Sequence, residues 1–219
     1  MKKHHLPQYQ YTAREVVSGL QFIAYAQECS LTYANLFAEI IIGHLKKCGI
    51  NLRNCRTWPR GRFQTDNGSE FIGAWSAKEP SVFTKTVESV KGLVHDTIPP
   101  GAHTYLKTQN SCQADVETVH GIIEDEFYEI EPFSSLPILL AKVTQYIIWF
   151  NIARRNSYKG YKTPWEIIHE RDPTISPEIA TLPAFSLDQI LKIKLDKTTS
   201  WSKSTKRGYD LVQYPFFCT

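Results

Sequence analysis

The sequence predicts an α/β domain, in which strands and helices alternate along the chain. Two strand-like runs come first, helices with apolar residues three and four positions apart follow, and a short strand separates the first two helices. Apolar residues make up 42% of the 219 residues, which is enough for a core and argues against global disorder. The net charge of +3 is mild and does not by itself indicate a nucleic-acid binder.

The first elements follow from local sequence signals. Residues 8–27, "QYQYTAREVVSGLQFIAYAQ", are rich in aromatic and β-branched residues on both sides of a turn ending in Ser18-Gly19, which predicts two strands. Ser30 is a suitable N-cap for the next helix, and Gly49 is suited to follow its last turn. The run "RFQT" then predicts a short strand that ends at Asp66.

Three more helices and a tail complete the predicted organisation. One helix begins near Pro80, a second runs to about Ile130, and a third covers about 136–154. A Pro- and Ser-rich composition, with a basic stretch, sets in after Asp172. We therefore expect a core over 1–172 and a tail over 173–219.

The cysteines and the apolar runs indicate the cellular compartment of the protein. The five cysteines are odd in number and form no CxxC pair, which is typical of free thiols in a reducing compartment. The most apolar run, "LPILLAKVTQYIIWF", is short for a membrane span and contains Lys142. The sequence thus predicts a cytoplasmic protein that is not inserted in a membrane.

Asp66 is the first candidate functional residue. It lies in "TDNGSEF", at the end of a predicted strand, where small turn residues leave its carboxylate unobstructed. Sites in α/β sheets gather at strand ends, because loops can converge there on a rigid scaffold. Taken alone, however, Asp-Asn-Gly is typical of an ordinary surface turn.

A second carboxylate is found in "QADVETVHGIIEDEFYEIE". Glu117, His120 and Glu124 stand at positions i, i+3 and i+7, so they share one helix face beside a buried apolar face. Taken alone, this pattern is equally typical of a solvated acidic helix.

Four motifs in series change the interpretation: "TDNGSEF", "IPPG", "VETVH" and "FNIARRNSYKGYKTPWEI". Their order resembles the catalytic core of retroviral-type integrases and of the DDE transposases of bacterial insertion sequences, from about residue 8 to Asp172. The resemblance implies an RNase H-like mixed sheet flanked by helices. It also implies DNA integration or transposition by two-metal phosphodiester cleavage and strand transfer.

The resemblance assigns the site residues by position. Asp66 would be the second aspartate of the family and Glu117 its final glutamate, both catalytic and both metal ligands. Asp115 is the weaker candidate for the last role, because the family's residue is followed by x-x-His. The implied cofactor is Mg²⁺ or Mn²⁺, two ions in an intact member. The implied partners are DNA, both element ends and target, and further copies of the chain.

The sequence departs from the family at the first aspartate. The family carries it on the first, central strand of the sheet, whereas residues 1–65 contain no Asp. We therefore expect the first strand to be missing, and the chain alone to be poorly soluble or molten. Three hypotheses remain: a transposase core active with an upstream part, an inactive remnant that binds DNA or an intact transposase, and an RNase H-like nuclease.

The predicted DNA contacts lie beside the two carboxylates and in a basic, aromatic segment. Tyr158 and Tyr161 interleave with cations in that segment, a composition that suits phosphates and base stacking. The same cations could instead complement the dipole of a solvated helix end. The predicted DNA-binding residues are Asn67, His120, Arg154, Arg155, Lys159 and Lys162.

Overall fold

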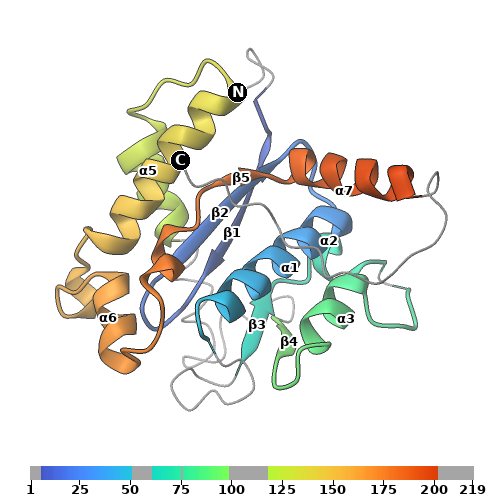
Figure 1. Ribbon diagram of the computed structural model, residues 1–219, viewed down its shortest axis with the longest axis horizontal. Coiled ribbons are helices and arrows are strands. Elements are labelled where there is room, and N and C mark those ends of the chain that lie inside the picture. Colours follow the sequence, from blue (N-terminus) through green and yellow to red (C-terminus); the bar gives the residue numbers. More distant parts are fainter. Residues whose placement is uncertain (1–5, 51–60, 75, 99–117, 202–219) are drawn as a thin grey trace. The chain divides into compact units, whose positions relative to one another are not determined.

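The computed structural model describes residues 6–50, 61–74, 76–98 and 118–201 (Figure 1). The chain divides into two compact units, Met1–Asp188 and Gln189–Thr219. Residues after 172 contribute to the first unit, where Ile179 and Leu187 are fully buried. The boundary between catalytic core and tail at 172/173 stays a prediction.

The predicted hairpin is present. Strand β1 (Tyr9–Arg14) pairs antiparallel with β2 (Gln21–Ala26), and the short β5 (Phe185–Ser186) joins β2 in parallel. The turn is held by the Glu15 carboxylate, which accepts hydrogen bonds from the backbone N–H groups of Val17 and Ser18. Gly19 follows at φ +84°, a conformation that favours glycine.

Helix α1 (Leu31–Lys47) covers one face of this sheet. Phe37 contacts Tyr11 of β1 with ring centroids 5.9 Å apart, and His44 contacts Phe22 of β2 at 5.7 Å. Ser30 is the N-cap residue as predicted, although its side chain makes no capping hydrogen bond. Gly49 takes a positive φ after the last turn, which confirms the predicted end of the helix.

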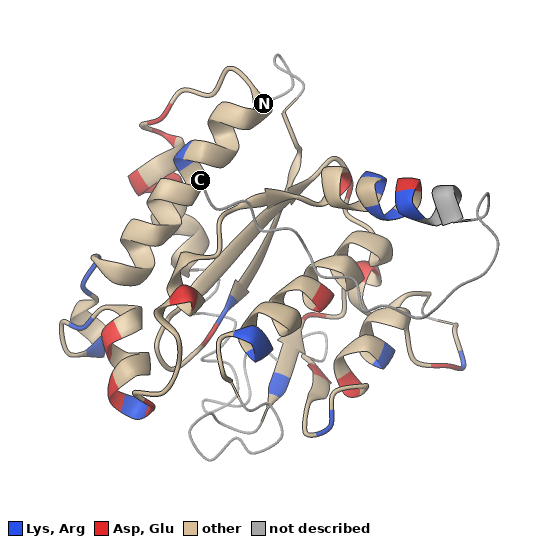
Figure 2. Cartoon of the chain, in the orientation of Figure 1, with Lys and Arg blue, Asp and Glu red and all other residues tan. Residues whose placement is uncertain are grey.

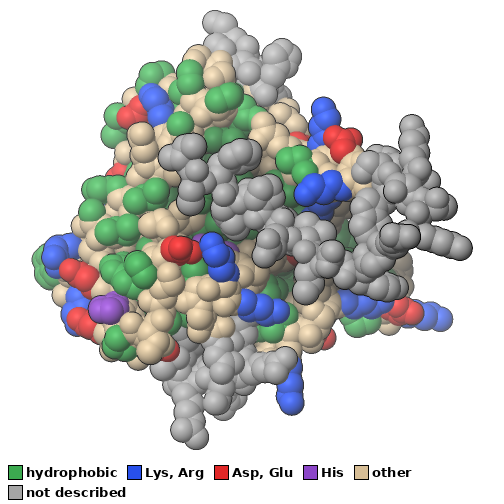
Figure 3. All heavy atoms as spheres, viewed as in Figure 1, with side chains coloured by type: hydrophobic (Ala, Val, Ile, Leu, Met, Phe, Trp, Pro, Cys, Tyr) green, Lys and Arg blue, Asp and Glu red, His purple; other side chains and the backbone are tan. Residues whose placement is uncertain are grey.

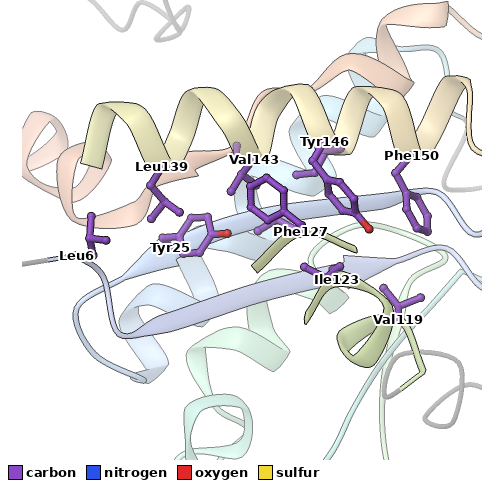
Figure 4. Packing of buried hydrophobic residues seen from close by; sticks show 12 residues of the cluster. Leu6, Tyr25, Val119, Ile123, Phe127, Leu139, Val143, Tyr146 and Phe150 are labelled. Carbon is purple, nitrogen blue, oxygen red and sulfur yellow. The ribbon is translucent and has the colours of Figure 1, made fainter. Parts of the chain in front are cut away.

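The opposite face of the sheet is covered by α5 (Leu136–Ile152) and by a helix described from residue 118. That helix continues as the π-helix η3 (Glu124–Tyr128). Figure 4 shows side chains of α5 pointing towards Tyr25 and Phe127 across a single apolar cluster. Because alternate residues of β2 face opposite sides, this strand is buried throughout.

A second, two-stranded sheet holds the Asp66 segment. Strand β3 (Arg62–Thr65) pairs in parallel with β4 (Val94–Thr97). The short α2 (Ser69–Ile72) and α3 (Val82–Glu88) flank it, and α1 contacts both helices. Among the described residues, β1 and β3 each pair on one side only. The mixed α/β class is confirmed.

The remaining elements follow α5. They are the 3₁₀ turn η4 (Ser157–Lys159), α6 (Pro164–Arg171), the 3₁₀ turn η5 (Pro177–Thr181) and α7 (Leu187–Trp201). Thr163 and Glu166 form a capping box that starts α6. None of the described helices is long and apolar enough to cross a membrane.

Candidate active site

Asp66 lies directly after β3 with its side chain exposed. Its Oδ1 atom accepts a hydrogen bond from the Gly68 N–H at 3.0 Å, the local turn that Asp-Asn-Gly favours. A Cβ atom on Gly68 would lie 2.5 Å from a Glu70 carboxylate oxygen, so glycine lets that carboxylate fold over the turn. Asn67 is half-buried in the same turn.

A chain of hydrogen bonds ties this turn to its surroundings. The Thr65 hydroxyl donates to the carbonyl of Asp66 at 2.9 Å and lies 2.8 Å from His95 Nε2. Since the Thr65 hydrogen is used on Asp66, Nε2 of His95 is the donor of the second bond. His95 Nδ1 lies 2.8 Å from the Thr84 hydroxyl, and Ser81 donates to the Phe71 carbonyl. Both ends of the 66–71 segment are thereby fixed.

Burial keeps two histidines neutral. Desolvation lowers the pKa of His95, although the carboxylates of Glu88 and Asp96 oppose the effect. It also lowers the pKa of His44, whose Nε2 lies 3.3 Å from the Ile179 carbonyl. A folded-state pKa below the unfolded value of 6.5 means that the unfolded chain binds more protons between the two values.

We therefore expect the free energy of unfolding to be highest above pH 6.5. It should fall as the pH drops through the folded-state pKa values of the two histidines. Thermal unfolding followed by circular dichroism between about pH 8 and about pH 5 measures this slope. His95→Gln removes one titrating group and should flatten the slope. An unchanged slope in this variant would show that His95 contributes nothing to it.

The structure brings Cys29 close to Asp66 and to Glu70 of the same turn, and the sequence predicted neither Cys29 nor Glu70 as a site residue. Burial raises the pKa of the Cys29 thiol, and the Glu70 carboxylate and the charge of Asp66 raise it further. The Tyr11 hydroxyl also lies at this thiol and accepts a hydrogen bond from the Ser30 N–H at 3.0 Å. No short motif joins Cys29 to the Asp66 turn, because the contact depends on how α1 packs between the sheet and α2.

Glu117 lies outside the described residues, and so does Asp115. Over the described part of the chain, no group of three Cys, His, Asp or Glu side chains is arranged to hold a metal ion. Asp66 is thus in place as one exposed carboxylate, and its pairing with Glu117 stays a prediction.

His120 is exposed and lines a pocket of about 580 Å³. Glu124 lies one turn further along the same helix and also lines the pocket, as do Gln10 and Tyr128. Tyr25, Tyr128 and Gln10 form a hydrogen-bonded row, in which Tyr128 donates to the Gln10 side chain. Burial raises the pKa of Tyr128 to about 12, so the row is uncharged.

Two of the four predicted DNA-binding cations are engaged in internal contacts. Arg154 forms a two-point ion pair with Glu126, with its closest N–O distance at 2.6 Å, and stacks over the Phe150 ring at 5.1 Å. Lys159 donates to the backbone carbonyls of Val16 and Val17 at 2.7 and 3.0 Å. These contacts join the segment after α5 to η3 and to the hairpin turn.

The other two cations form exposed pairs. Arg155 bonds Glu166 at 3.2 Å, and Lys162 bonds Glu170 at 2.5 Å. The alternation of blue and red around α6 is visible in Figure 2. Between Arg155 and Lys162, Tyr158 is 97% exposed and Tyr161 68% exposed, on a loop closed by the Asn156 N–H, which donates to the Lys162 carbonyl at 3.1 Å.

Part of the sequence matches a known protein family. The integrase core domain family matches residues 117–168, from the helix carrying His120 to the buried Ile168 of α6. This segment resembles an integrase/transposase catalytic core. The match covers less than half of the chain and does not reach Asp66. A search of curated proteins gives no match.

The match confirms the resemblance seen in the motifs. Glu117, His120 and the four cations after α5 all lie inside the integrase core segment. The match connects residues 117–168, rather than the whole chain, with the core domain of integrases. The motif "TDNGSEF" stands outside the matched segment, and its role depends on the position of Asp66 at the end of β3.

Proposed function

We propose that the chain is the catalytic core of a DDE transposase or integrase and acts on DNA in the cytoplasm. The observation that supports this best is the integrase core match over 117–168 in a chain whose Asp66 lies exposed at a strand end. In this proposal Asp66 and Glu117 bind Mg²⁺ or Mn²⁺. Two such ions, when bound, activate the attacking oxygen and stabilise the leaving oxygen at phosphorus.

Asp66 fits the role of a ligand to such an ion. One of its oxygens is occupied by the Gly68 N–H, and the other makes no hydrogen bond with the described residues. Mg²⁺ prefers hard oxygen ligands and keeps several waters, so a carboxylate on a solvent-facing turn is suitable. The Thr65–His95 contacts hold the turn, so Asp66 would need little rearrangement to bind.

We further propose that β1 and β3 lie on either side of a central strand of an RNase H-like sheet. The two described sheets are separate, each ends in a strand paired on one side, and α1 contacts elements of both. A strand inserted between them would satisfy the backbone groups of both edges. It would also supply the first carboxylate of the site.

The second candidate is an inactive remnant that binds DNA or an intact transposase. Its support is that residues 1–65 contain no Asp that could serve as the family's first aspartate. The two functions are distinguished by a strand-transfer assay with Mg²⁺, using labelled DNA ends and a plasmid target. A version lengthened at its N-terminus by an Asp-bearing strand should form joined products. If this version still bound DNA but formed no joined products, the result would favour the inactive remnant.

The contacts of the four cations lead to different expectations for DNA binding. Exposed ion pairs contribute little to stability, so Arg155 and Lys162 can exchange their carboxylates for phosphates. Arg155→Ala and Lys162→Ala should each weaken DNA binding and reduce its salt dependence by about one counterion. Arg154→Ala should instead destabilise the fold by roughly 1–2 kcal/mol.

Fluorescence anisotropy of a labelled duplex at several salt concentrations measures the first effect, and thermal unfolding measures the second. Lys85→Ala, on α3 and paired with Glu79, is the matched control for an exposed cation. If Lys85→Ala lost the same affinity for the duplex, DNA would bind to surface cations in general and not to the loop after α5. Tyr158→Ala tests stacking, which should affect single strands more than duplexes.

A further inference from the structure

The pocket beside His120 is lined by residues from the start of β1 and from the helix that continues as η3. Its volume of about 580 Å³ falls within the range of small-molecule sites, about 300–1,000 Å³. Aromatic rings form part of its wall. The Tyr128 and Phe133 rings stand at 71° to each other with centroids 6.0 Å apart, and Tyr9 is 44% exposed at the same pocket. A flat group can therefore stack against this wall.

The hydrogen-bonded row at this pocket has a fixed direction. The Gln10 side-chain nitrogen donates to the Thr12 hydroxyl at 2.8 Å, and the Gln10 oxygen accepts from Tyr128. Since the Tyr128 hydrogen is used in this way, Tyr25 is the donor of the bond between the two tyrosines. Both hydroxyl hydrogens are thereby occupied, whereas both hydroxyl oxygens keep lone pairs. Towards a ligand, these two hydroxyls can only accept hydrogen bonds.

Glu124 adds a charged acceptor to the same pocket. Burial and, with it, the charge of the Glu124 carboxylate raise the pKa of Tyr128, so this charge acts on the hydroxyl row. Within the described part of the chain, Glu124 forms no ion pair, and no Lys or Arg side chain lines the pocket. The pocket therefore favours a ligand that donates hydrogen bonds and carries a positive charge.

The segment around Glu124 is acidic, with five carboxylates between residues 124 and 131. Two of them are neutralised, because Arg154 pairs with Glu126 at 2.6 Å and Lys142 pairs with Glu131 at 2.5 Å. Figure 3 shows a basic and an acidic side chain next to each other near the first turns of α5. A nucleobase in the pocket would bring its phosphates beside the remaining carboxylates, where like charges repel. A cationic ligand is attracted by the same field.

We propose that this pocket binds the guanidinium group of an arginine side chain from another polypeptide. A guanidinium is planar and stacks on aromatic rings, and its N–H groups form a rigid fork that fits a carboxylate at two points. The Glu124 carboxylate accepts two of these hydrogens and the Tyr128 oxygen accepts a third. An ammonium group matches the charge but not the flat shape. Ile130, two positions after Tyr128, is 67% exposed and offers an apolar contact to the polypeptide that carries the arginine.

The experiment is a titration of the full native chain with capped tripeptides, acetyl-Gly-X-Gly-amide, followed by ligand-observed NMR. The residue X is arginine, lysine or citrulline, which is the uncharged isostere of arginine. A pH of about 8 keeps histidines of ordinary pKa uncharged. A few charge-assisted hydrogen bonds correspond to a Kd on the order of 1 mM for the arginine peptide. The citrulline peptide should bind at least about ten-fold more weakly, and the lysine peptide should lie between the two.

Glu124→Gln should weaken binding of the arginine peptide at least about ten-fold, because it removes the charge and keeps the size of the side chain. It should also remove the advantage of arginine over citrulline. Glu129→Gln is the matched control, since Glu129 is an exposed carboxylate of the same segment and lies outside the pocket lining. This control should bind the arginine peptide as the native chain does. Equal losses in the two variants would mean that the acidic segment as a whole attracts the peptide, and would overturn the proposal.

Adenosine and cytidine, titrated in the same way, test the alternative occupant. If either nucleoside bound more tightly than the arginine peptide, and Glu124→Gln weakened that binding, the pocket would take a nucleobase and the proposal would be wrong. The titrations are repeated on the N-terminally lengthened version, which contains the same pocket residues. Absence of arginine-peptide binding to both versions also overturns the proposal. The samples contain neither DNA nor metal ions, so the outcome does not depend on the proposed function.

Discussion

Asp66→Asn should abolish strand transfer in an active, lengthened version of the protein while leaving the fold unchanged. The asparagine keeps an oxygen that accepts the Gly68 N–H, so the turn after β3 is retained. It loses the negative charge that a divalent ion requires. Because metal stabilisation of the transition state is worth several kcal/mol, we expect a loss of about a thousand-fold or more.

The measurement is the yield of joined DNA in Mg²⁺ together with the thermal unfolding midpoint. Glu79→Gln is the matched control, since Glu79 is a surface carboxylate that pairs with Lys85 of α3. Its activity should equal that of the parent. Retained activity in Asp66→Asn would remove Asp66 from the metal site. A lowered midpoint would show that Asp66 supports the fold instead.

Asn151→Leu should destabilise the first unit by about 3 kcal/mol or more. The Asn151 amide is buried at the end of α5 and bonds both backbone groups of Gln21, at 3.1 and 3.0 Å. It also donates to the Ala180 carbonyl of η5 at 3.3 Å. Leucine would leave three buried backbone groups without partners, and each unsatisfied group costs roughly 1–3 kcal/mol.

Chemical denaturation of the native chain and the variant measures the difference. Asn35→Leu is the control on α1, because the Asn35 side-chain oxygen is buried without a partner among the described residues and its amide nitrogen donates to the Glu39 side chain at 2.9 Å, not to the backbone. This control loses one side-chain hydrogen bond and leaves no buried backbone group without a partner, so it should cost about 1 kcal/mol or less. If both variants lost the same stability, leucine itself would be the cause, and the Asn151 hydrogen bonds would not be needed to explain the effect.

Local signals in the sequence were sufficient for the elements that carry the site. The hairpin depends on Glu15 and Gly19, α1 on its apolar spacing, and β3 on the short run that ends at Asp66. The motifs "VETVH" and "TPWE" stand in the segment that the integrase core family matches. These features depend on neighbours a few positions apart, where propensity and periodicity act directly.

Tertiary structure alone decided which polar groups meet. Nothing in the order of residues indicates that Arg154 pairs with Glu126, or that Lys159 bonds the turn at Val16. The approach of Cys29 to the turn of Asp66 and Glu70 is equally a result of packing.

The physical reason is the range of the forces. Hydrophobic periodicity along one segment states which side is buried, but not which distant segment covers it. Hydrogen bonds and ion pairs form between whatever groups that packing brings within about 3 Å. The sequence therefore determined a strand-helix alternation and an exposed carboxylate at a strand end. Only the tertiary structure shows which cations bond to groups of the protein core and which face solvent.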